Sequence, residues 1–135
     1  MKQDIRLIFS TSESDFYVDG TEFNDSDLKN ISESTITLNL EMSNITDDGI
    51  KNLPKLPNLI CIDFDSTKIT NESLKIIGKY KSLKEIWIEE TQINDFGIKY
   101  LTELENLEFI SILDTKITEK GVNLLQTAIP NLRIH

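Results

Sequence analysis

Apolar residues recur along the chain at intervals of 24 positions, and Ile45, Ile69, Ile93 and Ile117 form one such series. Four further series keep the same interval: Leu38-Ile62-Ile86-Ile110-Ile134, Ile50-Leu74-Ile98-Val122, Leu53-Ile77-Leu101-Leu125 and Leu59-Leu83-Leu107. Chance does not align five apolar series. The sequence therefore predicts a protein built from a repeated structural unit.

Each unit changes its hydrophobic period part-way. Residues 83–88 alternate apolar and other side chains, as a short strand does, whereas Ile98, Leu101 and Leu104 follow helical spacing. A strand followed by a helix is therefore predicted in every unit. The residue before each helix can cap it, because a side-chain oxygen there accepts an N–H of the first turn. The predicted N-caps are Thr46, Thr70, Asn94 and Thr118, and the small residues Gly49, Ser73, Gly97 and Gly121 keep that turn narrow where adjacent helices pack.

The combined pattern, L-x-x-L-x-L-x-x-T-x-I-T-x-x-G-L/I-x-x-L, resembles the bacterial 24-residue leucine-rich repeat and is close to its cysteine-containing subtype. The clearest copy runs from Leu83 to Leu101, and the resemblance covers roughly residues 14–135. It implies an α/β fold: a right-handed solenoid forming a short arc, with a parallel β-sheet on the concave face and helices on the convex face. Threonine stands where the family often has Asn or Cys, and its hydroxyl is expected to bond the turn backbone of a neighbouring unit.

The two ends of the chain depart from the pattern. Residues 16–18 belong to a degenerate unit that begins 22 residues before the next one, and Ile5, Leu7 and Phe9 are expected to pair with that unit as an N-terminal β-hairpin cap. We predict one domain, residues 1–135, with a cap strand in 1–13 and about five repeats in 14–135. The chain ends on a strand whose register at Ile134 is the least certain, because one residue is inserted near 128–131. An uncovered edge there favours self-association.

Charge narrows the partners that the chain can have. The net charge of −9 and the isoelectric point near 4.6 exclude nucleic acid and an anionic membrane, which need Lys and Arg, and favour a basic protein. The simpler interpretation is that the charge keeps the protein soluble. A cytoplasmic location is expected, because we find no signal peptide and no apolar run long enough to span a bilayer, and the single Cys61 suits a reducing compartment.

Alternate strand positions are expected to face solvent on the concave side. They form three rows: Asp15, Thr37, Cys61, Glu85, Phe109 and Arg133; then Tyr17, Asn39, Asp63, Trp87, Ser111 and His135; then Asp19, Glu41, Asp65, Glu89 and Leu113. Seven of these seventeen positions are acidic, whereas the lysines concentrate in the helical segments. Large apolar side chains ringed by charge are typical of interfaces, so Trp87, Phe109 and Leu113 are the predicted anchor.

The predicted partner-binding residues are Tyr17, Asp19, Glu41, Asp63, Asp65, Glu85, Trp87, Glu89, Phe109 and Leu113, with contributions expected from the adjoining rim at Ser66, Glu90 and Asp114. Two alternatives remain open: the acidic residues only solubilise the sheet, or the local register buries one of the aromatic residues.

The sequence offers no catalytic apparatus. The only histidine is the terminal His135, and acids beside Cys61 would raise the pKa of its thiol. Asp63 and Asp65 lack a pocket that would separate their pKa values. We also find no EF-hand loop, zinc spacing, phosphate-binding glycine loop or heme motif, so no catalytic residue, metal or cofactor is predicted.

The expected function is protein binding: a cytoplasmic module that holds a basic partner on an acidic concave face. The architectural similarity to ribonuclease inhibitors and to many bacterial immunity proteins implies a more specific version, in which the chain occludes the active site of a toxin or nuclease. The alternatives are an adaptor or regulatory subunit of a larger assembly, and a calcium-binding domain.

Overall fold

Short strands and helices alternate along the computed structural model, which describes residues 15–17 and 23–135. The strands are β1 (Asp15–Tyr17), β2 (Thr37–Asn39), β3 (Cys61–Asp63), β4 (Glu85–Trp87), β5 (Phe109–Ser111) and β6 (Arg133–Ile134). The α-helices are α2 (Asp47–Ile50), α3 (Asn71–Ile77), α4 (Asp95–Ile98) and α5 (Glu119–Ala128), and the 3-10 helices are η2 (Asp25–Asn30) and η3 (Lys99–Leu101). The prediction of an α/β fold is confirmed.

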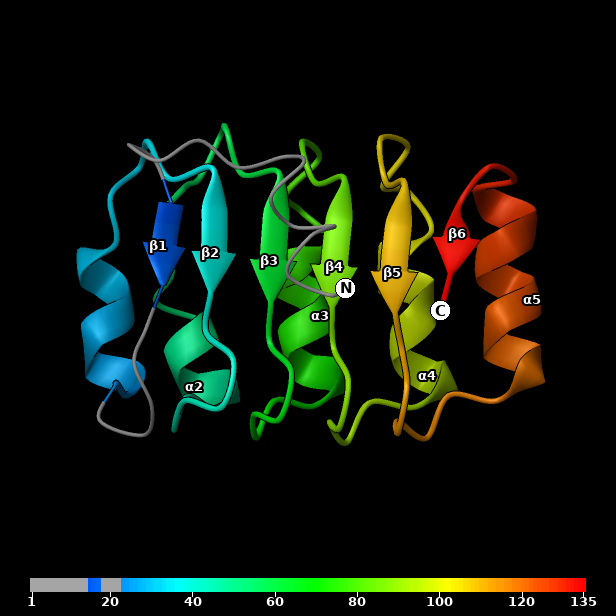
Figure 1. Ribbon diagram of the computed structural model, residues 1–135, viewed down its shortest axis with the longest axis horizontal. Helices are drawn as coiled ribbons and strands as arrows, with labels where there is room; N and C mark the ends of the chain where they lie inside the picture. The colour runs from blue at the N-terminus through cyan, green and yellow to red at the C-terminus, as the bar shows by residue number, and fades with distance from the viewer. Residues whose placement is uncertain (1–14, 18–22) are drawn as a thin grey trace.

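The strands form one parallel sheet in the order β1-β2-β3-β4-β5-β6, with the helices along one face (Figure 1). Ile62 pairs with Ile86, Ile86 with Ile110 and Ile110 with Ile134, so the interval of 24 residues is the interval between neighbouring strands. Phe16 pairs with Leu38, so the first unit has the shorter spacing of 22 residues that the sequence predicted. The insertion near the end of the chain leaves the register of β6 unchanged.

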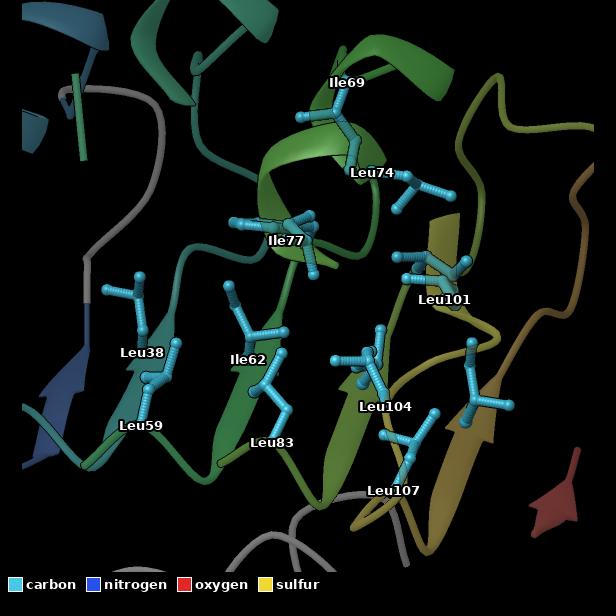
Figure 2. Packing of buried hydrophobic residues seen from close by; sticks show 14 of the residues in the cluster. Leu38, Leu59, Ile62, Ile69, Leu74, Ile77, Leu83, Leu101, Leu104 and Leu107 are labelled. Atoms are coloured by element: carbon cyan, nitrogen blue, oxygen red, sulfur yellow. The ribbon is translucent and has the colours of Figure 1, made fainter. Parts of the chain in front are cut away.

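The core lies between the sheet and the helices (Figure 2). Ile62 from β3 and Ile86 from β4 meet Leu74 and Ile77 from α3, and all four are fully buried. These are the periodic apolar positions of the sequence. Helices this short gain little stability by themselves, so burial of this shared face is what holds them.

All four predicted N-caps are confirmed. The side chains of Thr46, Thr70, Asn94 and Thr118 each accept a hydrogen bond from the backbone N–H two residues further on. The capping residue of one unit is also bonded to the preceding unit. Asp47, directly after Thr46, accepts from the Thr70 N–H at 2.8 Å and from the Thr70 hydroxyl at 2.6 Å.

The same bond between units recurs along the helix N-termini, and we call the series the cap ladder: Asp25 to Thr46, Asp47 to Thr70, Asn71 to Asn94, and Asp95 to Thr118. It explains the small residues that follow the caps. A Cβ added to Gly97 would lie 2.4 Å from Asn71 Oδ1. Ser73, which replaces glycine in its unit, instead donates its hydroxyl to Asp47 Oδ1 at 2.6 Å.

The role expected for the turn threonines is wrong. The Thr67 hydroxyl donates to the carbonyl of Phe64 and the Thr91 hydroxyl to that of Ile88, each at 2.7 Å. Both bonds close a turn within the same unit, because the hydroxyl lies directly over the carbonyl three residues earlier. The units are therefore linked by the cap ladder and the sheet, not by these hydroxyls.

The predicted N-terminal cap strand in residues 1–13, with Ile5, Leu7 and Phe9, lies outside the described residues, and the hairpin stays a prediction. Within residues 15–17 and 23–135, the helices are all too short or too polar to cross a bilayer.

Candidate functional site

The face of the sheet that points away from the helices carries the predicted rows of side chains. Cys61 pairs with Glu85 and Glu85 with Phe109, while Asp63 pairs with Trp87 and Trp87 with Ser111. Both rows run across neighbouring strands as the repeat predicted. We call this surface the helix-distal face, made of the outward positions of β2 to β5: Thr37, Asn39, Cys61, Asp63, Glu85, Trp87, Phe109 and Ser111.

An aromatic cluster occupies the middle of the helix-distal face. The rings of Trp87 and Phe109 lie 5.0 Å apart between centroids, and Cys61 packs in the same cluster, separate from the aliphatic core. The Trp87 indole N–H donates to the Glu85 carboxylate on the same strand. The guanidinium of Arg133 lies 5.4 Å from the centre of the Phe109 ring, a cation–π distance.

Apart from the half-buried Asn39, this face is closed to solvent, as is Asp65 just beyond β3, and here the sequence prediction is wrong. Trp87 is 2% exposed, Phe109 4%, Asp65 1%, and Asp63 and Glu85 0%. Trp87 and Phe109 pack against each other across neighbouring strands, which hides part of each ring from solvent. Alternation along a strand identifies the face on which a residue lies, but not what lies over that face. These five residues therefore do not form a solvated docking surface.

The buried carboxylates bind backbone groups at the ends of the strands. Asp63 Oδ1 accepts the N–H of Asp65 at 2.8 Å, and Asp65 Oδ1 accepts the N–H of Glu89, in the turn after β4, at 2.7 Å. The Glu89 carboxylate in turn accepts the hydroxyl of Ser111. These hydrogen bonds hold backbone N–H groups in place, so the acids fix the turns that follow β3 and β4.

Directly after the strands, the predicted site does reach solvent. Leu113 is 44% exposed, as expected, and Glu90 and Asp114 are exposed, while Glu41 and Glu89 are half-buried. Met42, which the sequence did not single out, is 60% exposed. We call this surface the strand-end rim: Glu41, Met42, Ser66, Glu89, Glu90, Leu113 and Asp114.

Four rim residues share an unusual backbone conformation. Met42, Ser66, Glu90 and Asp114 have φ angles of 61°, 55°, 54° and 58°, in the left-handed region. They stand at the same place in successive units. Because none is glycine, residue type gave no signal for this turn; only the shared interval could have found it. The remaining predicted residues, Tyr17 and Asp19, cannot be placed: the side chain of Tyr17 and the whole of Asp19 lie outside the described residues.

Within the described ranges, no three His, Cys, Asp or Glu side chains are grouped so that they could hold a metal ion. Cys61 is fully buried in the aromatic cluster. The acids at Asp63, Asp65 and Glu85 have structural partners, and among the described residues of the predicted site the rim is the part that a macromolecule can touch. No family model matches the chain, and no curated protein is significantly similar to it.

Proposed function

We propose that this chain is a leucine-rich-repeat solenoid that binds a basic protein, and that it does so through the strand-end rim. The leucine-rich-repeat assignment is supported by the interval of 24 residues, the unit of strand and helix, and the parallel register. Fold alone does not determine function, so the binding proposal depends on the rim itself.

The observation that carries the proposal is the composition of the rim. It combines exposed carboxylates at Glu90 and Asp114 with exposed apolar side chains at Met42 and Leu113, and it has no basic residue. Apolar anchors beside charge are typical of protein interfaces, and the acids would steer a basic partner toward them. A solvent-exposed Leu or Met gains nothing for the fold, so its place here is better explained by a partner.

The buried acids contribute by holding the rim in place. Asp65 fixes the backbone of Glu89, and Ser111 fixes the Glu89 carboxylate. A surface that is already ordered loses less conformational entropy on binding, which raises affinity. Asp65 and Ser111 thus support the interface instead of forming it.

Occlusion of a basic active site, as in a toxin or nuclease, is the specific form of binding that we favour. The chain binds without catalysis and acts in the cytoplasm under this proposal. The net charge of −9 would speed encounter with such a target, and an apolar anchor would slow its release.

A paired pull-down tests the proposal. The rim variant carries Glu90→Lys and Leu113→Ser; the control carries Glu105→Lys and Leu124→Ser, which change the same residue types where Leu124 is 47% exposed on α5. We expect wild type and control to recover the same basic protein from native lysate, and the rim variant to recover about tenfold less. Equal recovery by all three, or recovery of an acidic protein, contradicts the proposal.

A further inference from the structure

A second surface lies at the opposite ends of the strands. A groove of about 520 Å³ opens between the segment that precedes β3 and the segment that joins α3 to β4. These segments lead into the amino ends of the strands, whereas the strand-end rim follows their carboxyl ends (Figure 1). The floor of the groove is apolar and consists of Leu53, Pro54, Pro57, Ile76 and Tyr80.

Tyr80 is a departure from the repeat. It stands where Leu56 and Leu104 stand in the units on either side, and both of those leucines are buried in the core. Tyr80 is only half-buried, and its hydroxyl donates to the carbonyl of Pro54 at 3.1 Å. Burial raises the pKa of Tyr80, so the phenol stays neutral. The substitution brings an aromatic ring to the surface at a place where the repeat calls for a core leucine.

The edge of the groove is basic. Lys55, Lys79 and Lys81 line it, and Lys81 lies 3.6 Å from Glu103. For Lys55 and Lys79, no carboxylate of the described residues lies within ion-pair distance. One unit further on, Glu103 and Glu105 occupy the positions of Lys79 and Lys81. The groove therefore carries positive charge in a chain whose net charge is −9, whereas the equivalent positions of the next unit are negative.

The lysines do not merely complement helix ends. A cation near a helix C-terminus is favoured, and Lys79 follows α3. Yet Glu103 follows η3 at the equivalent place, where the same effect would also favour lysine. The helix end alone therefore does not account for Lys79, which lines the apolar groove.

We propose that this groove binds a peptide segment of a partner protein in which an apolar residue is flanked by acidic residues. The apolar side chain lies on the floor between Leu53, Ile76 and Tyr80, and the carboxylates face Lys55, Lys79 and Lys81. An open groove leaves one side of its ligand in solvent, whereas ligand pockets bury most of a small molecule's surface, so the groove suits one side chain of a peptide better than a small molecule. Charge complementarity selects the acidic flanks.

With the rim at one end of the strands and the groove at the other, the chain has two docking surfaces of opposite charge. That arrangement lets the chain hold a basic protein at the rim and an acidic peptide segment in the groove at the same time. The inference about the groove does not depend on the proposed function of the rim, because different residues carry the two surfaces.

Binding of synthetic peptides to the full chain tests the groove. The probe is a fluorescein-labelled EELEE peptide, followed by anisotropy, with EEGEE and KKLKK as comparison peptides. We expect EELEE to bind and EEGEE not to bind, and the Lys55→Glu/Lys79→Glu variant to weaken binding of EELEE about tenfold. Any binding of KKLKK belongs to the acidic rim and should not be weakened by this variant. The control is Lys51→Glu/Lys99→Glu, which makes the same change of charge at lysines that directly follow α2 and α4; it should stay within about twofold of wild type.

Further measurements distinguish peptide binding in the groove from the alternatives. Melting curves establish that each variant folds, and Lys55→Gln/Lys79→Gln replaces the charge reversal if that one unfolds. The rim variant should bind EELEE as wild type does, so the two proposals fail independently. Equal binding of EEGEE, or equal loss in the control, overturns the groove. If the chain self-associates and only the groove variant abolishes this, the occupant of the groove is a second copy of the chain. If dodecanoate binds more tightly than EELEE, the occupant is a lipid-like carboxylate. Either result overturns the peptide assignment.

Discussion

The two faces of the sheet are both buried, yet only one of them repeats. On the side of the helices, Leu38, Ile62, Ile86 and Ile110 follow one another across the strands as nearly identical aliphatic residues. On the helix-distal face, the neighbouring positions read Thr37, Cys61, Glu85 and Phe109. Burial alone therefore does not impose a repeat. On the side of the helices, the repeat is favoured because each aliphatic side chain packs against its own equivalent in the next unit.

This difference indicates where specificity can be introduced. The helix side tolerates little change, since closely packed interiors respond to a single methylene. The strand-end rim and the groove beside Tyr80 both occur where the chain leaves the repeated pattern. The rim carries exposed apolar residues beside acids, and the groove carries half-buried apolar residues beside lysines.

Truncation of Trp87 gives the largest expected effect and tests whether the helix-distal face is a true packing surface. Because Trp87 is 2% exposed, Trp87→Ala should lower the free energy of unfolding by about 3–5 kcal/mol, comparable to the roughly 2–5 kcal/mol expected for Ile86→Ala on the other face. Urea denaturation followed by circular dichroism measures both, since Trp87 is the only tryptophan.

Leu113→Ala is the control on the rim, where the side chain is 44% exposed and a change within about 0.5 kcal/mol is expected. If Trp87→Ala behaved like this control, the tryptophan would be a solvated anchor after all, and the helix-distal face would return as the docking surface.

The sequence predicted the scaffold well because the scaffold repeats. Strand register from β2 to β5, the caps at Thr70 and Asn94, and the small residue at Gly97 each follow from one unit compared with the next. Exposure could not be obtained in the same way. The alternation around Trp87 places it on a face of the sheet and carries no information about what covers that face.

Two further features were missed for local reasons. The left-handed turn at Met42 uses a residue that rarely adopts that conformation, so composition gave no sign of it. The groove at Tyr80 was hidden because a tyrosine in a leucine position still counts as apolar. Departures within an apolar series, and not the series itself, were the signal to follow.

The cap ladder gives the next prediction, since it belongs to the repeating side. Asp47→Ala removes the acceptor for the Thr70 N–H, the Thr70 hydroxyl and the Ser73 hydroxyl, and should cost about 2 kcal/mol. Asp48→Ala is the matched control: the neighbouring carboxylate is exposed and meets only Lys51 at 3.7 Å, so a loss below about 0.5 kcal/mol is expected by urea denaturation. Equal losses would show that the ladder does not link the units.

The dependence on pH identifies the charged acceptor. Burial raises the pKa of Asp47, but hydrogen bonds from Ser73 and Thr70 outweigh it and lower the pKa below 3.8. Since the pKa is lower in the folded chain than in the unfolded one, the stabilisation is complete above pH 3.8 and is lost as the pH falls through the folded value. Asp47→Asn should therefore lose less stability than wild type between pH 5 and 2. An amide can take this place, as Asn71 does toward Asn94.

The smallest expected effect concerns the left-handed turn at Met42, which follows β2. Met42 has a φ of 61° and is 60% exposed, so glycine there removes left-handed strain and little packing. Strain of about 1–2 kcal/mol is relieved, while the greater freedom of glycine in the unfolded chain opposes it, for a net gain of about 0.5 kcal/mol in urea denaturation. Asp114→Gly, at a φ of 58°, should gain less, because aspartate tolerates this conformation better than methionine. A Met42→Gly protein that is more stable but recovers less of the basic partner would mean that the rim keeps a strained methionine for binding, whereas unchanged recovery would remove Met42 from the interface.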